Sequence, residues 1–226
     1  MNTDLKQRIE SLLEETENKG VRLVAATKTV CPEIINEAVS YGIKTIGENR
    51  VQELLEKYDK IDKRNIEIHF IGKLQTNKVK YIIDKVDLIH SVDSLKLGQV
   101  INKYAAEYGK IQEILIEVNV SGEETKGGIA PDELEQLLVS LSKLDNIKVR
   151  GLMCIPSVEK IPGENKRFFD LLYKLLVDNN NKNIDNIYMD ILSMGMSGDY
   201  LTAISSGATM VRVGTKIFGQ RNYTEV

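Results

Sequence analysis

The residues with the clearest chemical potential lie between positions 191 and 219, in the segment ILSMGMSGDYLTAISSGATMVRVGTKIFG. Ser197 stands where one apolar run ends and a short helical pattern begins, and Gly214 and Thr215 stand where the next apolar run ends. Hydroxyl groups and backbone amides at neighbouring strand ends are the donors that a phosphate group needs. The segment therefore predicts a binding site for a phosphorylated cofactor or substrate.

Arg212 interrupts the second of these apolar runs, within the sequence MVRVG. Because side chains alternate along a strand, we expect Arg212 to point away from the face that carries Val211 and Val213. Burying a guanidinium group is costly unless it is paired or binds a ligand. Arg212 is therefore a candidate ligand-binding residue, and a structural ion pair is the alternative interpretation.

Lys28 ends another apolar run, VRLVAATK. Most lysines are solvated, but a neutral lysine amine can also attack an aldehyde and form a Schiff base. A lysine, a phosphate site and a buried arginine together suggest pyridoxal 5′-phosphate. An arginine only donates hydrogen bonds, so the ring nitrogen that faces it must accept and stays unprotonated. Such a ring is a weak electron sink, which favours cofactor binding, or racemisation through a short-lived carbanion.

The elements that must position these residues can be read from the alternation of apolar runs and helical patterns. The strand candidates are 21–28, 44–49, 66–72, 88–93, 113–120, 148–156, 190–197 and 209–215. Most are short apolar runs of the kind found in parallel strands buried on both faces. Helical patterns lie between them, starting at Pro32, near Val79, after Ser94, at Pro131 and near Phe168.

Eight alternations indicate an α/β protein built as one (β/α)8 TIM barrel domain over residues 1–226, with a doubly wound sheet as the alternative. Residues 4–19 carry one apolar stripe that ends at Gly20, so residues 1–20 are expected to form an extra helix packed on the barrel. Functional groups of such barrels lie at the carboxyl ends of the strands, and phosphate sites commonly use the last two. This rule predicts that the site is built from the strand ends, which are Lys28, Asn49, Gly72, Asp93, Asn119, Pro156, Ser197 and the Gly214–Thr215 turn.

Composition limits the function classes. The net charge is −3 and the basic residues are scattered, which argues against a nucleic-acid partner. No apolar run is long enough to span a bilayer, and the polar N-terminus is not a secretory signal. Cys31 and Cys154 are far apart, so neither a disulfide framework nor a CxxC site is expected. We predict a reduced, cytoplasmic compartment and no metal site.

Two groups of residues receive a conservative interpretation. His69 and His90 lie within strand candidates, so we interpret them as hydrogen-bonded core residues, with His69 also a candidate for supporting the pocket. Lys73, Lys78 and Lys80 are interpreted as a solvated helix face. Guidance of an anionic cofactor toward the barrel is the alternative for these lysines.

An ordered set of motifs carries a family resemblance. The motifs are VAATKT around Lys28, IGENRVQE at 46–53, HFIGKLQTNK at 69–78, IHSVDS at 89–94, LSMGMSGDYLTAI at 192–204 and MVRVGTKIFG at 210–219. Together they resemble the pyridoxal-phosphate homeostasis protein family, also known as YggS or proline synthase co-transcribed homologue. Each motif alone is weak, but the set recurs in order over nearly the whole chain.

The resemblance implies a fold-type-III barrel, similar to the N-terminal domain of alanine racemase, that holds pyridoxal 5′-phosphate as an internal aldimine on Lys28. It implies that Ser197, Gly214 and Thr215 hold the phosphate and that Arg212 faces the ring nitrogen. Asn49 would lie against the ring or its hydroxyl. Met194 and Met196 would line the pocket, with the Met196 backbone amide a further candidate for the phosphate.

The function implied is that of a cofactor carrier or buffer in vitamin B6 homeostasis without efficient turnover. Alanine racemase supplies a second base from a further domain, and Lys28 is the one convincing base in this sequence. An amino-acid racemase of low activity and a Schiff-base aldolase acting on a phosphorylated sugar are the alternatives. We expect a monomer, with pyridoxal phosphate-dependent apoenzymes as candidate partners.

Overall fold

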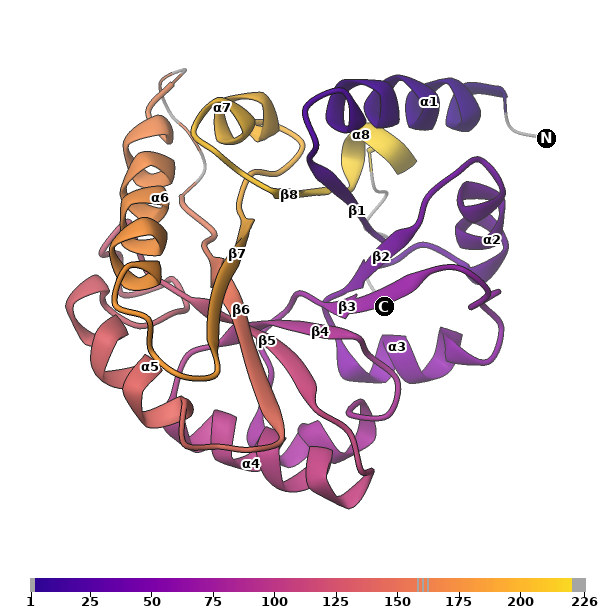
Figure 1. The fold of residues 1–226 in the computed structure, drawn as a ribbon. Coiled ribbons are helices and arrows are strands. Elements are labelled where there is room, and N and C mark those ends of the chain that lie inside the picture. The colour runs from indigo at the N-terminus through magenta and orange to yellow at the C-terminus, as the bar shows by residue number, and fades with distance from the viewer. Residues whose placement is uncertain (1–2, 158, 160, 162, 221–226) are drawn as a thin grey trace.

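Eight parallel strands close into a barrel in chain order, with β8 hydrogen-bonded to β1 (Figure 1). This is a computed structural model, and it describes residues 3–157, 159, 161 and 163–220. The strands are β1 (Arg22–Ala26), β2 (Thr45–Glu48), β3 (Glu67–Phe70), β4 (Leu88–Val92), β5 (Gln112–Glu117), β6 (Ile147–Met153), β7 (Ile187–Ser193) and β8 (Met210–Val213). The prediction of a TIM barrel is confirmed, and each strand candidate overlaps an observed strand.

Helices connect successive strands on the outside of the barrel (Figure 1). They are α1 (Thr3–Glu17), α2 (Pro32–Ser40), α3 (Val51–Tyr58), α4 (Leu95–Glu107), α5 (Leu134–Leu141), α6 (Lys166–Asn180), α7 (Tyr200–Ser205) and α8 (Thr215–Phe218). Two 3₁₀ segments, η1 (Thr76–Tyr81) and η2 (Pro131–Glu133), complete the set. The pattern near Val79 thus forms a short 3₁₀ segment rather than an α-helix.

Two apolar layers hold the barrel together. The inner cluster fills the barrel and consists of Val24, Leu88, Leu115, Met153 and Met210. A larger outer cluster joins the strands to the helices and includes Val211 and Val213. Arg212 lies between these two valines and pairs in register with Val24, so its side chain faces the barrel interior, as the alternation along the strand predicts.

The N-terminal helix packs where the barrel closes. Leu5, Ile9 and Leu12 form its buried stripe, and Gly20 follows the helix with a φ of 66°, a left-handed conformation that favours glycine. α1 contacts β1 and α8, and the two helices lie side by side in Figure 1. The hydroxyl of Tyr200 at the start of α7 also donates to the Glu15 carboxylate.

The junction between β1 and β8 brings together the two ends of the described chain. The register runs from Arg22 opposite Met210 to Ala25 opposite Val213. Lys28 follows β1 by two residues and Gly214 follows β8 directly, so both lie at the same edge of the sheet. No helix in the described segments combines the length and apolar character that crossing a membrane requires.

Candidate functional site

A cavity of about 250 Å³ lies at the carboxyl ends of the strands. It is lined by Ala26, Lys28, Asn49, Ile71, Ile155, Met196, Ser197, Gly198, Arg212, Gly214 and Thr215. Seven of the eight residues singled out from the sequence are therefore gathered around one cavity. They come from loops after β1, β2 and β7 and from β8 and its following turn, although they are distributed over most of the chain.

The loop that carries Lys28 is fixed by a buried ion-pair network. Thr29, the next residue, has a φ of 62°, which is uncommon for a β-branched residue. Its backbone amide donates to the Glu53 carboxylate. Lys57 donates to Glu53 at 2.6 Å and to the backbone carbonyl of Thr27 at 2.9 Å. The strained turn around Lys28 is thus held on both sides by side chains from α3.

Glu48 is the deepest member of this network. Its Oε1 accepts from Thr27 Oγ1 at 2.7 Å and from Lys57 Nζ at 3.0 Å, while its Oε2 has no hydrogen-bond partner among the described residues. Burial raises the pKa of the Glu48 carboxyl, and Lys57 opposes that rise. The network supports the Lys28 loop from below without lining the cavity.

Ser197 joins the two loops that were predicted to hold a phosphate. Its Oγ accepts hydrogen bonds from the backbone amides of Gly214 at 3.2 Å and Lys216 at 3.5 Å. The turn that presents Ser197 depends on Gly195, which has a φ of 87° and whose added Cβ would lie 2.5 Å from the Cβ of Ala203. Amide groups and a hydroxyl therefore converge at this side of the cavity, next to the exposed Thr215.

The two methionines differ in position. Met196 lines the cavity, but its backbone amide donates to Asp199 Oδ1 at 2.6 Å. Asp199 is itself held by Asn165 at 2.9 Å. Met194 is fully buried in the outer core and does not line the cavity, so the structure does not place it where we predicted. The difference arises because Met194 continues β7 into the core before the chain turns at Gly195.

Arg212 has its guanidinium inside the barrel, with only 4% of the residue exposed. Nη1 donates to Ser193 Oγ at 2.6 Å and Nη2 donates to the backbone carbonyl of Cys154 at 2.8 Å. It forms no salt bridge with any described carboxylate, so the alternative of a structural ion pair finds no partner in this part of the chain. Burial lowers the pKa of Arg212 from its ordinary value, yet a guanidinium stays protonated in proteins. The arginine therefore presents to the cavity a positive charge that no direct salt bridge within the described residues neutralises, although the carboxylates of Glu117 and Asp199 oppose the fall in its pKa.

The position of Asn49 depends on a glycine of the next loop. A Cβ added to Gly72 would lie 2.0 Å from the backbone oxygen of Asn49, a distance that no side chain tolerates. The Gly72 carbonyl is in turn bound by Ser91 Oγ at 2.5 Å. The close approach of the two loops brings Asn49 to the cavity wall.

Sequence reasoning missed part of the lining and one nearby acid. Ala26, Ile71 and Gly198 line the cavity although they were noted only as members of motifs, and Ile155 lines it although it was noted only within the strand candidate 148–156. Glu117, the last residue of β5, is also nearly buried. Burial and then the charge of Asp93 raise the pKa of Glu117, and Arg212 opposes the rise. Its place at a strand end is the signal that could have identified it.

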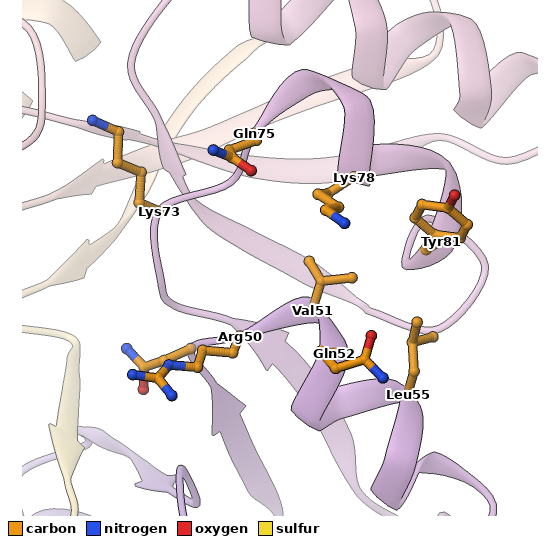
Figure 2. A pocket seen from close by; sticks show the side chains of 9 residues that line it. Arg50, Val51, Gln52, Leu55, Lys73, Gln75, Lys78 and Tyr81 are labelled. Atoms are coloured by element: carbon orange, nitrogen blue, oxygen red, sulfur yellow. The ribbon is translucent and has the colours of Figure 1, made fainter. Parts of the chain in front are cut away.

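A larger hollow, of about 580 Å³, adjoins the cavity and shares Asn49 with it. Figure 2 shows Val51, Gln52 and Leu55 from α3 on one side and Lys78 and Tyr81 from η1 on the other. Arg50 and Lys73 lie toward the opposite end of the hollow (Figure 2). The chemistry predicted from the sequence requires an amine beside phosphate donors, and that combination is found in the smaller cavity with Lys28.

Comparison with known proteins places this geometry in a family. The family profile described as alanine racemase, N-terminal domain, matches residues 3–222. A protein of Aquifex aeolicus named pyridoxal phosphate homeostasis protein is 48% identical over 202 residues, which cover 89% of this chain and 88% of that protein. The chain belongs to the pyridoxal phosphate homeostasis protein family. The resemblance drawn from the sequence motifs is confirmed.

Solved structures agree with membership of the pyridoxal phosphate homeostasis protein family. PipY of Synechococcus elongatus, solved with pyridoxal phosphate bound, has a TM-score of 0.87 and 32% identity, covering 95% of this chain and all of PipY. An alanine racemase of Clostridium difficile in complex with cycloserine has a TM-score of 0.77 at 19% identity, and the chain covers 62% of that enzyme. This second likeness shows a shared barrel fold.

Proposed function

We propose that this protein binds pyridoxal 5′-phosphate and acts in the homeostasis of that cofactor. The observation that carries the proposal is the convergence of Lys28, Ser197, Gly214, Thr215 and Arg212 on one cavity at the carboxyl end of the barrel. Relatives of the same family bear the name pyridoxal phosphate homeostasis protein, and PipY was solved with pyridoxal phosphate bound. Geometry and family membership support the same ligand.

The donors of the cavity fit the functional groups of that ligand. The Gly214 and Lys216 amides and the Ser197 hydroxyl would hold a phosphate, since they already converge on one another. The Lys28 amine would hold the aldehyde carbon covalently. Arg212 would donate to the ring nitrogen, and Asn49 would contact the ring or its hydroxyl. When bound, the ligand supplies an electron-poor ring attached through an imine-forming aldehyde.

We further propose that the protein carries or buffers the cofactor without efficient turnover. Racemisation needs a base on each face of the substrate. Among the described residues that line the cavity, Lys28 is the one side chain that can serve as a base, since Arg212 stays protonated. Delivery to apoenzymes, a monomeric state and a cytoplasmic location belong to the same proposal.

A low-activity racemase is the second candidate, favoured by the shared barrel of the alanine racemase neighbour. A chiral assay with common L-amino acids separates the two proposals. Turnover that is lost in Lys28→Ala would support a racemase, and absence of turnover in a protein loaded with cofactor would support a carrier.

The experiment that tests cofactor binding is the absorption spectrum of the purified protein after addition of pyridoxal 5′-phosphate. We expect a near-visible band that borohydride bleaches, with the cofactor retained on the protein by mass spectrometry. Lys28→Ala should lack the band, whereas Lys73→Ala, in the neighbouring hollow, should keep it. A wild-type protein without the band would overturn the proposal and favour a phosphorylated sugar as the ligand.

A further inference from the structure

A line of hydrogen-bonded polar side chains crosses the barrel interior from Arg212 to the opposite end. We name it the interior relay, and it consists of Arg212, Ser193, His90, His69 and Glu67. Arg212 Nη1 lies 2.6 Å from Ser193 Oγ, and Ser193 Oγ lies 3.0 Å from His90 Nδ1. His90 Nε2 lies 3.0 Å from His69 Nδ1, and His69 Nε2 lies 3.0 Å from Glu67 Oε2.

The side chains of the relay are buried over most of its length. Ser193 and His90 are fully buried, and His69 is 1% exposed. These residues come from β7, β4 and β3, so the bond between Ser193 and His90 joins strands that are not neighbours in the barrel. Polar groups placed among the apolar side chains of the inner cluster are costly unless each one is hydrogen-bonded. The relay satisfies that condition at every step.

The donor inventory fixes the direction of each hydrogen bond. The ionised Glu67 carboxylate can only accept, so His69 donates to it from Nε2. A neutral His69 ring then accepts at Nδ1 from His90 Nε2, and a neutral His90 ring accepts at Nδ1 from the Ser193 hydroxyl. Arg212 can only donate, and Ser193 Oγ accepts from it. All four bonds therefore point from the cofactor cavity toward Glu67.

The far end of the relay opens into a second cavity, of about 410 Å³, at the amino ends of the strands. Glu67 begins β3 and is half exposed, and it pairs with Arg22 of β1. Other charged groups around His69 are Asp87, Lys110, Glu113 of β5 and Arg150 of β6. Arg150 is itself paired with Glu113 and with Asp190 of β7. His69 and Arg22 hold the pKa of Glu67 below its ordinary value, so the relay ends on an ionised acceptor.

We propose that Ser193, His90, His69 and Glu67 are positioning residues for Arg212, which orient its guanidinium in the cofactor cavity and couple it to charge at the other end of the barrel. This inference rests on the proposed function, because it gives Arg212 a ligand to face. Arg212 forms no salt bridge with a described carboxylate, so its guanidinium is held by Ser193 Oγ and the Cys154 carbonyl, and the relay extends the first of these contacts to Glu67.

The direction of the relay explains how a change at its far end reaches Ser193, the hydrogen-bond acceptor of Arg212. An imidazolium donates from both nitrogens, so a protonated His69 cannot accept from His90. The His90 ring would then donate toward Ser193, and the Ser193 hydroxyl hydrogen would lose its acceptor. The orientation of the hydroxyl group on which Arg212 rests therefore depends on residues that lie outside the cofactor cavity.

The test uses the fact that His69 and His90 are the two histidines of the chain. Long-range ¹H–¹⁵N NMR of the cofactor-free protein reports which nitrogen of each ring carries hydrogen. We expect Nε2–H on both rings in the wild type. Ser193→Ala removes the donor to His90 and should lower its ratio of Nε2–H to Nδ1–H about tenfold, since a buried hydrogen bond contributes on the order of one such factor. Glu67→Gln should lower the corresponding ratio of His69.

Glu113→Gln is the matched control, because Glu113 lines the same far cavity and pairs with Arg150 but is not part of the relay. In Glu113→Gln, the rings of His69 and His90 should carry hydrogen on the same nitrogens as in the wild type. Glu67 is half exposed, so Glu67→Gln is expected to fold even if Ser193→Ala does not. Wild-type rings protonated at Nδ1 would overturn the relay, whatever the cofactor does.

The second readout is the near-visible absorption maximum of each variant loaded with pyridoxal 5′-phosphate. A shift in Glu67→Gln and Ser193→Ala, but not in Glu113→Gln, would support coupling to Arg212. Altered tautomers with an unshifted maximum would overturn the positioning role. A wild type that takes up no cofactor would instead overturn the proposed function, while the tautomers still test the relay itself.

Discussion

The ammonium group of Lys57 lies 3.0 Å from Oε1 of Glu48, and both side chains are buried beneath the loop that carries Lys28. The same ammonium donates to the Thr27 carbonyl at 2.9 Å. The cavity itself contains little charge besides Lys28 and Arg212, so the charged groups that shape it lie one layer below its surface. This arrangement makes the support of the lysine loop separable from the groups that touch a ligand.

Removal of Lys57 should therefore weaken the fold more than removal of a surface lysine. Lys57→Met leaves the Glu48 carboxylate buried without its partner, which we expect to lower the free energy of unfolding by about 3–5 kcal/mol. Urea denaturation of the cofactor-free protein measures the change. The exposed Lys60→Met is the control and should change the value by less than about 0.5 kcal/mol. Equal losses in the two variants would contradict the structural role of the pair.

A second prediction concerns the turn before Ser197. Gly195→Ala places a Cβ 2.5 Å from that of Ala203 at a φ of 87°, so we expect a loss of stability of about 2 kcal/mol. Gly198→Ala is the matched control, because no atom lies within 4 Å of its added Cβ. Thermal unfolding without cofactor compares the two. A Gly195→Ala protein as stable as Gly198→Ala would show that the turn can relax.

A third prediction separates the phosphate contact from the rest of the site. Ser197→Ala should weaken binding of pyridoxal 5′-phosphate roughly 10- to 100-fold, since a hydrogen bond to a charged group contributes about 1.5–3 kcal/mol. Binding of pyridoxal, which lacks the phosphate, should be unchanged. Ser205→Ala, an exposed serine of α7, controls for the loss of a hydroxyl. Equal weakening for both ligands would place Ser197 elsewhere than at the phosphate.

A fourth prediction follows from His90. Burial, and then the charges of His69 and Arg212, hold the pKa of His90 well below its ordinary value. The unfolded chain therefore binds more protons than the native protein from about pH 6.5 downward. In that window the free energy of unfolding decreases as the pH decreases, by up to about 1.4 kcal/mol per pH unit. The raised pKa values of Glu48 and Glu117 act in the opposite sense, since they favour the native state at low pH.

A comparison with His90→Gln isolates the histidine from these acids. Urea denaturation between pH 5 and 8 should give the variant a flatter dependence on the acid side of about pH 6.5. The difference between the two curves is the contribution of His90, because the carboxylates are common to both proteins. Parallel curves would mean that His90 takes up its proton as easily in the native protein as in the unfolded chain.

The barrel was predictable because its strands are short apolar runs and its candidate residues sit where those runs end. Lys28, Ser197 and Arg212 were recognisable since each breaks an apolar pattern with a group that needs a partner. Their common location followed from the rule that strand ends meet at one edge of a barrel. Met194 was assigned to the pocket by the family resemblance alone, and it lies buried in the core just before the turn at Gly195.

The supporting networks were not predictable from local pattern. Glu48 lies in the motif IGENRVQE, and nothing in the sequence near it identifies Lys57 of α3 as its hydrogen-bond partner. Ser193 and His90 are separated by 103 positions, and their hydrogen bond crosses the barrel rather than following a strand ladder. Such contacts depend on the curvature of the closed sheet, which is a property of all eight strands together.

The pairing of β1 with β8 also determines when the site can come into being. The lysine loop is synthesised well before the turn at Gly214 and Thr215. Because their approach requires β1 and β8 to meet, a nascent chain on the ribosome has the amine long before it has the phosphate donors. Loading must then follow closure of the barrel, and bound cofactor would slow the separation of β8 from β1. A truncation that ends before β8 is expected to retain Lys28 but to capture no cofactor.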